Sequence, residues 1–404
     1  MKKIAFVSIL SFAFLFFACD KKDIPGLDEL PLKTKQLIDS DNDFGFDLFQ
    51  LVSADAEPGE NICVSPLSIS LALAMTYNGA GGDTQIAMEE ALRLAGFSRD
   101  EINELYRGLE QSLVTDDPKV QVEIANSIWY RNDFEILSDF VQRNEIYYDA
   151  KVESLDFSDP LSKDIINEWV SEKTYDKIES IVDQISPESF MFLINAIYFK
   201  GTWQYEFDKK GTVNRPFYFE DGTVNEVPAM KLEADLNLYK SEIFNAVELP
   251  YGKGNWVMYV LVPNMTHRVD EIISSLDNDS WKSYLPMFQE TKEVKIQLPK
   301  WKSEYETSLV PVLQNMGMGV AFTSAADFSG ILPGAPLFIS DVKHKTFIEV
   351  NEEGTEAAAV TSVEIVLTSI QGEFFTVDKP FVYLIAEKTT GSVLFAGRVM
   401  DPAK

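Results

Sequence analysis

Hydrophobic positions in the first part of the chain recur at helical spacing. The dipeptide Ser65-Pro66 is typical of a helix start, because serine caps the first turn and proline is tolerated there. The apolar run behind it predicts a helix over 67–77. Ser98 with Glu101 three residues later fits a capping box, and apolar residues on one face predict another helix near 162–177.

Strand patterns dominate the later part of the chain. Apolar residues alternate with polar ones over 120–124, and the run 191–199 is almost continuously apolar, as in a strand buried on both faces. The apolar runs 381–386 and 393–396 flank a Thr-Thr-Gly turn, which predicts a hairpin. The pattern predicts an α+β protein with extensive sheet, and residues 43–404 contain no linker, which favours one large domain.

The first residues are typical of a targeting segment that takes no part in the fold. Two lysines precede an apolar run over 4–17 that is too short to span a bilayer comfortably. The run ends in Phe16-Phe17-Ala18-Cys19, which resembles a bacterial lipobox and implies cleavage before Cys19 and acylation of its thiol. Residues 1–18 are therefore expected to be a lipoprotein signal peptide. An ordinary signal peptide that leaves a free thiol is the alternative.

Residues 19–42 are polar and contain Pro25 and Pro31, which predicts a lipidated N-terminus followed by a flexible tether. The protein is then expected to be exported and anchored by lipid at the cell envelope, with display on the outer-membrane surface and secretion as alternatives. Cys63 lies in an apolar stretch, which predicts a buried structural thiol. With Cys19 acylated, no disulfide is available.

Charge and motif content exclude several classes of function. The formal net charge of −29 repels nucleic acid and anionic headgroups, so neither is expected as a primary partner. Cys63 and two histidines, His267 and His344, do not make a metal site, and no cofactor is expected. The chain has no Gly-x-Ser-x-Gly elbow and no phosphate-binding glycine loop, so we do not expect an enzyme.

The segment Glu352-Glu353-Gly354-Thr355-Glu356-Ala357-Ala358-Ala359-Val360-Thr361 carries the functional argument. Read with a period of two, one face is small or apolar throughout, whereas the other holds Glu356 and Glu364. This alternation predicts a half-buried strand, although alanine packs poorly on a permanent pleated surface. Small residues suit a segment that slides between existing strands, with Gly354 as a hinge. An ordinary exposed, alanine-rich loop is the alternative.

The same segment is similar to the hinge of inhibitory serpins, and three further motifs occur in the order of that family. These are Ser65-Pro66-Leu67-Ser68, Asn195-Ala196-Ile197-Tyr198-Phe199-Lys200-Gly201-Thr202-Trp203, and Asp378-Lys379-Pro380-Phe381 with Phe395-Ala396-Gly397-Arg398-Val399. The resemblance covers roughly residues 43–402. It implies a single serpin-like domain over 43–404, α+β, with three β-sheets, eight or nine helices and an exposed reactive-centre loop at about 352–376.

The resemblance implies a protease inhibitor that acts as a suicide substrate. A serine protease, with cysteine proteases as a second class, cuts the loop and is held as an acyl-enzyme while the loop inserts into the central sheet. The inserted strand gains hydrogen bonds and buried area, so the native form is metastable. A monomer is expected. The alternatives are a non-inhibitory serpin-like binding or chaperone protein and an unrelated hydrolase.

The resemblance also implies roles for particular residues. Counting about seventeen residues from Glu352, as the geometry of the inserting loop suggests, puts the reactive bond at Thr368–Ser369, with Leu367–Thr368 and Ser369–Ile370 as register alternatives. A threonine at the cut bond, preceded by Leu367, suits elastase-like or subtilisin-like proteases.

The hinge comprises Glu352, Gly354, Thr355, Glu356, Ala357, Ala358 and Ala359. The shutter, under the strands that part, comprises Ser65, Ser68, Asn195 and His344, and the breach, where the loop begins to enter, comprises Trp203, Lys300 and Glu352. Within the breach, we expect Lys300 and Glu352 to pair.

Overall fold

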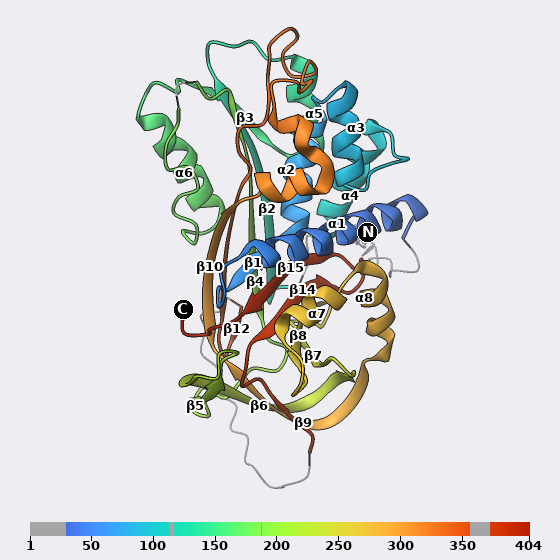
Figure 1. The fold of residues 1–404 in the computed structure, drawn as a ribbon, viewed down its shortest axis with the longest axis vertical. Coiled ribbons are helices and arrows are strands. Elements are labelled where there is room, and N and C mark those ends of the chain that lie inside the picture. Colours follow the sequence, from blue (N-terminus) through green and yellow to red (C-terminus); the bar gives the residue numbers. More distant parts are fainter. Residues whose placement is uncertain (1–29, 114–116, 187, 356–371) are drawn as a thin grey trace, which may run out of the picture.

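Nine α-helices and two β-sheets make up the part of the chain that the computed structural model describes, which is residues 30–113, 117–186, 188–355 and 372–404. Most helices gather at the upper end of the view in Figure 1, and one sheet runs along the long axis beneath them. The helices are α1 (Leu32–Asp55), α2 (Pro66–Tyr77), α3 (Gly82–Ala91), α4 (Arg99–Leu113), α5 (Ser138–Tyr148), α6 (Leu161–Lys173), α7 (Val269–Ser275), α8 (Asn278–Tyr284) and α9 (Val310–Leu313), with short turns η2 (Leu285–Met287), η3 (Gln314–Met318) and η4 (Gly319–Phe322).

Local signals placed the helix starts well. Helix α2 begins at Pro66, as predicted, and α4 begins behind a capping box in which Ser98 N–H donates to Glu101 at 2.8 Å and Glu101 N–H donates to the Ser98 hydroxyl at 3.3 Å. Helix α6 ends at Lys173, four residues earlier than predicted. On its apolar face Ile166 is fully buried, but Ile165 is 40% exposed.

The predicted tether over 19–42 is wrong for its last part, because α1 already begins at Leu32. Leu37 and Ile38 are buried and continue the helical apolar spacing that runs on to Phe44 and Phe49, so the core draws this segment in. Residues 19–29 lie outside the described ranges. Within those ranges, no helix combines the length and the hydropathy needed to cross a membrane.

The six-stranded sheet has the order β10–β11–β12–β4–β2–β3. Strands β2 and β4 pair antiparallel over nearly their whole length, and so do β10 and β11. The pair β10–β11 and the group β4–β2–β3 are the two halves of this sheet. Among the described strands, β12 joins these halves, and β11 and β4 do not pair with each other directly. The strands are β2 (Val120–Arg131), β3 (Lys151–Leu155), β4 (Met191–Thr202), β10 (Trp301–Ser308), β11 (Lys343–Val350) and β12 (Gly354–Thr355).

The other sheet has nine strands, in the order β1–β15–β14–β8–β7–β6–β9–β13, with β5 paired to β6. Three sheets were expected, but the long strands β6 and β9 run through two of them and join them into this one. The predicted α+β fold is confirmed. The predicted hairpin is formed by β14 and β15, and Cys63 is fully buried in β1 as predicted. The strands are β1 (Ile62–Val64), β5 (Val213–Tyr218), β6 (Val224–Lys240), β7 (Phe244–Tyr251), β8 (Trp256–Pro263), β9 (Gln289–Pro299), β13 (Phe374–Thr376), β14 (Phe381–Glu387) and β15 (Val393–Val399).

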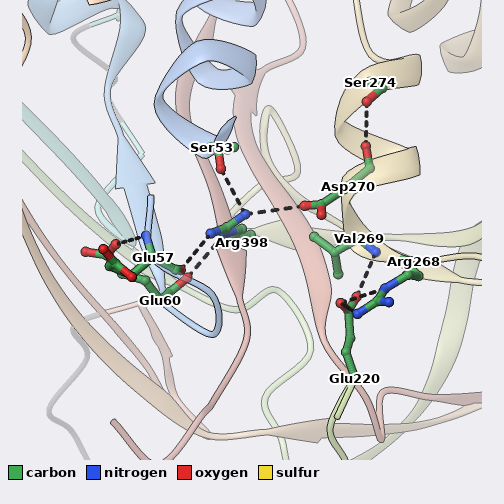
Figure 2. Close-up of polar contacts among 9 residues, drawn as sticks. All are labelled: Ser53, Glu57, Glu60, Glu220, Arg268, Val269, Asp270, Ser274 and Arg398. Carbon is green, nitrogen blue, oxygen red and sulfur yellow. Dashed lines mark hydrogen bonds and ion pairs between the residues drawn. The ribbon is translucent and has the colours of Figure 1, made fainter. Parts of the chain in front are cut away.

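A buried arginine fastens the end of α1 to the sheet. Arg398 lies on β15 and is only 4% exposed. Its guanidinium donates to three main-chain carbonyls and one carboxylate, as Figure 2 shows: Ser53 and Glu60 at 3.2 Å, Glu57 at 3.4 Å and Asp270 at 3.4 Å. A buried guanidinium must be satisfied in this way, and so must the carbonyls that it reaches.

Replacing Arg398 with methionine should lower the free energy of unfolding by about 3 kcal/mol, because three carbonyls lose their charged donor. Arg268→Met is the matched control, since the Arg268 guanidinium pairs with Glu220 at the exposed surface and its loss should lower the free energy of unfolding far less. Urea unfolding followed by circular dichroism measures both. Equal losses in the two variants would show that Arg398 does not fasten the helix.

Candidate functional site

The strand β12 occupies the gap between β11 and β4 with only two residues. Gly354 pairs with Thr202, and Thr355 pairs with Gly201 on one side and with Val350 on the other. The Thr355 side chain is buried, and its hydroxyl lies 2.6 Å from the hydroxyl of Tyr251. The hinge therefore begins as a strand inside the six-stranded sheet.

Position 354 requires glycine for two reasons: the backbone of β4 lies very close to it, and its backbone angle disfavours other residues. Its φ is +153°, and a Cβ atom at this position would lie 1.9 Å from the main-chain oxygen of Gly201. Any side chain would push β12 off β4. The glycine that the sequence predicted as a hinge lets the two backbones meet, and its role as a hinge stays a prediction.

Trp203 holds the residues that precede β12. Its side chain is buried and stacks on Tyr251, with ring centroids 4.3 Å apart and planes 11° from parallel. Its main-chain N–H donates to the Glu353 carbonyl at 2.9 Å, and its indole N–H donates to the Asn351 carbonyl at 2.9 Å. The main chain and the indole of Trp203 therefore both hold the chain just ahead of the hinge in place.

Lys300 and Glu352 form the pair expected at the breach. The ammonium lies 2.9 Å from Glu352 Oε2, and the Thr212 hydroxyl donates to Oε1 at 2.6 Å. Burial alone would raise the pKa of the Glu352 carboxyl, but the hydrogen bonds from Thr212 and Lys300 outweigh it and hold the pKa below its usual value. Glu352 is thus a carboxylate at neutral pH.

Sequence reasoning missed three residues of this site: Tyr251, Thr212 and Lys209, which pairs with Glu353. Tyr251 ends β7 and lies 104 positions from Thr355, so no local pattern linked the two. Only the fold brings these side chains to the hinge.

The shutter residues meet where α2 begins beneath the gap. The Ser65 main-chain N–H donates to His344 Nε2 at 3.1 Å, and the Ser68 hydroxyl donates to Asn195 Oδ1. Because His344 lies on β11 and Asn195 on β4, both strands that flank the gap are tied to the same helix. Asn195 also donates to Asn126 of β2 at 2.5 Å, a residue that the sequence did not single out.

Several predicted residues lie outside the described ranges. They are the lipidation site Cys19, the hinge residues Glu356, Ala357, Ala358 and Ala359, and the candidate bond residues Leu367, Thr368, Ser369 and Ile370. The segment that holds the loop residues starts in the six-stranded sheet at β12 and rejoins the fold at β13, which runs parallel to β9 in the other sheet. In the described ranges, no group of three or more His, Cys, Asp or Glu side chains is placed to hold a metal ion.

A comparison with known proteins gives matches over most of the chain. The family described as "Serpin (serine protease inhibitor)" matches residues 39–402. Intracellular coagulation inhibitor 2 of Tachypleus tridentatus is 34% identical over 369 residues, covering 89% of this chain and 90% of the relative. The native structure of the thermophilic serpin tengpin has a TM-score of 0.82 at 34% identity and covers 90% of this chain and 94% of its own. Human thyroxine-binding globulin complexed with thyroxine has a TM-score of 0.83 at 28% identity, with coverages of 92% and 99%.

Acid should weaken the fold through His344. Burial lowers the pKa of this imidazole to about 4, so between pH 6.5 and 4 the unfolded chain binds a proton that the folded protein does not. The stability that the neutral imidazole contributes is present above pH 6.5 and is lost as pH falls. Between pH 7 and 5 the free energy of unfolding of the native protein should fall by about 2 kcal/mol more than that of His344→Gln.

Urea unfolding of both proteins at the two pH values measures that difference. The carboxyls of Asp41 and Glu110, whose pKa values are raised to about 7 and about 8, are common to both proteins and cancel. Identical pH dependence in the two proteins would contradict a neutral, buried imidazole.

Proposed function

This chain belongs to the serpin family, and we propose that it inhibits proteases as a suicide substrate. Serpins are in general protease inhibitors and not enzymes. The observation that carries the proposal is the position of β12, which lies between β11 and β4 and pairs with both. Among the described strands, β11 and β4 do not pair with each other directly. Extending β12 by the residues that follow it would complete the strand.

Insertion is favourable for simple reasons. Each added residue can exchange main-chain hydrogen bonds with β11 on one side and β4 on the other. Thr355 is buried in the sheet, and with a period of two the residues that follow it on the same face are Ala357 and Ala359. Those side chains are small enough to enter between strands that are already packed.

The site also supplies a barrier to insertion before cleavage. The pairs Lys300–Glu352 and Lys209–Glu353 hold the chain ahead of β12, whose two residues are already paired in the sheet, so the part that would move begins after Thr355. Below it, the ties of His344 and Asn195 to α2 must rearrange as β11 and β4 part. A native state held by such ties is kinetically stable without being the most stable arrangement.

In the reaction, the protease's serine oxygen bonds to the carbonyl carbon of Thr368. The bond between Thr368 and Ser369 breaks, and the new amino group of Ser369 takes the proton. The loop, still esterified to the protease, then inserts. The pair Thr368–Ser369, with Leu367 ahead of it, suits elastase-like or subtilisin-like proteases, with cysteine proteases as a second class. The neighbouring bonds on either side are the register alternatives.

A non-inhibitory binding or chaperone protein is the second candidate, because the fold also resembles thyroxine-binding globulin, which was solved with thyroxine bound. The hinge argues against it. The inward positions Thr355, Ala357 and Ala359 hold no bulky, charged or proline residue, and a charge there would have to be buried during insertion.

We also propose that the protein is exported as a monomer and anchored to the membrane through an acylated Cys19. The lipobox-like residues before Cys19 support this proposal, and the polar residues after Cys19 would link the anchor to α1, which begins at Leu32. Secretion after an ordinary signal cleavage is the alternative.

Mixing the protein with an elastase should give a covalent band near the summed mass on a denaturing gel. It should also release a C-terminal fragment that mass spectrometry shows to begin at Ser369. Thr355→Arg should abolish the band and leave rapid turnover, because the arginine cannot be buried beside Tyr251. The control Thr355→Ser keeps the hydroxyl and should form the band. A band in Thr355→Arg would contradict insertion, and turnover without a band in the native protein would contradict inhibition.

Cys19→Ser should move the protein from the membrane fraction to the soluble exported fraction and abolish labelling by a radioactive fatty acid. Cys63→Ser is the matched control, because its buried thiol should carry no label. Unlabelled native protein in the soluble fraction would favour the ordinary signal peptide.

A further inference from the structure

A cavity of about 760 Å³ lies between the end of α1, the turn that joins β5 to β6, the helix α7 and the end of β15. It shares no residue with the hinge or the shutter. Charged side chains of both signs line it in nearly equal numbers, and Phe219, Ile273 and Met400 form an apolar wall. Such a balance of charge favours a ligand that carries both signs over a ligand with one net charge.

Ser53 brings a buried hydroxyl without a partner to this cavity. The residue lies near the end of α1, is 7% exposed and lines the cavity. Its Oγ atom is enclosed and forms no hydrogen bond among the residues that the structure describes. Buried hydroxyls are ordinarily paired, because an unpaired one has given up its hydrogen bonds to water. The Ser53 hydroxyl is therefore available to a polar group of a ligand.

Arg398 and Asp270 form a loose ion pair next to Ser53. Figure 2 shows the Arg398 guanidinium in contact with the Ser53 carbonyl, 3.2 Å from Nη1, and with Asp270 Oδ1, 3.4 Å from Nη1. The second distance is longer than the roughly 2.8 Å of a typical charge-assisted hydrogen bond. The Asp270 side chain is also 72% exposed, so its carboxylate can accept from other donors.

The guanidinium of Arg398 has capacity left for a ligand. It has one N–H more than its four hydrogen bonds use, and this N–H has no acceptor within the described ranges. The neighbouring ion pair is closed by contrast. Arg268 donates to Glu220 Oε2 through Nε at 2.9 Å and through Nη2 at 2.6 Å, and Glu220 Oε1 accepts from the Val269 N–H at 3.2 Å. Of these two pairs, the loose one suits a charged ligand better.

We propose that this cavity binds a free α-amino acid with an apolar side chain. The carboxylate of the ligand would accept from the Arg398 guanidinium and the Ser53 hydroxyl, and its ammonium would donate to Asp270. Both charges of an α-amino acid are attached to one carbon atom, so they lie close together and match the charges of the loose pair in opposite order. In a dipeptide, a peptide unit separates the two charges and weakens this match.

The side chain of the ligand would lie against the apolar wall, which removes apolar surface from water. Hydrolysis of peptides to free amino acids is the class of reaction that would supply such a ligand. Binding concerns the protein alone and does not rest on the proposed function.

Isothermal titration calorimetry with L-phenylalanine tests the site in the intact protein, without a protease. The native protein should bind L-phenylalanine at least about tenfold more tightly than L-phenylalaninamide, which lacks the carboxylate. It should discriminate as strongly against N-acetyl-L-phenylalanine, which lacks the ammonium.

Asp270→Asn keeps the shape of the side chain and removes its charge, so it should weaken the binding of L-phenylalanine at least about tenfold. Asp279→Asn is the matched control, because Asp279 is an exposed aspartate in the first turn of α8, as Asp270 is in the first turn of α7. It should bind like the native protein. Ser53→Ala should weaken binding about fivefold and leave the urea midpoint of unfolding unchanged or higher, since its hydroxyl has no partner to lose.

Absent binding of L-phenylalanine, equal binding of the amide or the N-acetyl derivative, or undiminished affinity in Asp270→Asn would each overturn the amino-acid site. A lower urea midpoint in Ser53→Ala would overturn the assignment of that hydroxyl to the ligand. Failure of the covalent band with elastase would bear on the proposed function and leave these binding results intact.

Discussion

Thr355 pairs with strands on both sides and Gly354 pairs with β4, and the insertion that we propose depends on this short ladder. It joins β11 to β4 and so holds together the two halves of the sheet. A glycine must stand at its start because the backbone of Gly201 leaves no room for Cβ. The ladder is therefore a two-residue strand that the proposed insertion would extend.

Two kinds of restraint act on this strand. Ahead of it, Trp203, Lys300 and Lys209 hold the chain by an indole and two ion pairs. Beneath it, β11 and β4 are tied separately to α2 through His344 and Asn195. In the mechanism that we propose, the first restraint would survive insertion, since it precedes β12, which is already paired in the sheet. The second would have to change as the strands part, which would give a local barrier that acid weakens through His344.

Part of this arrangement could be predicted from the sequence because it depends on local chemistry. The Ser65-Pro66 start of α2 and the small inward residues after Gly354 follow from capping, packing and period two. Other parts depend on contacts between distant segments. The stacking of Trp203 on Tyr251 and the Asn126–Asn195 bond have no local signature. The tether prediction was wrong over 32–42 because its polar composition hid the buried Leu37 and Ile38.

The central claim is that the cut loop becomes a strand between β11 and β4. The most direct measurement is the thermal unfolding midpoint before and after one cut within residues 360–369, made by a protease that is not trapped and verified by mass spectrometry. About twenty new main-chain hydrogen bonds should raise the midpoint by roughly 20 °C or more. An unchanged or lower midpoint after the cut, as in a loop that is cleaved and left outside the sheet, would contradict the account.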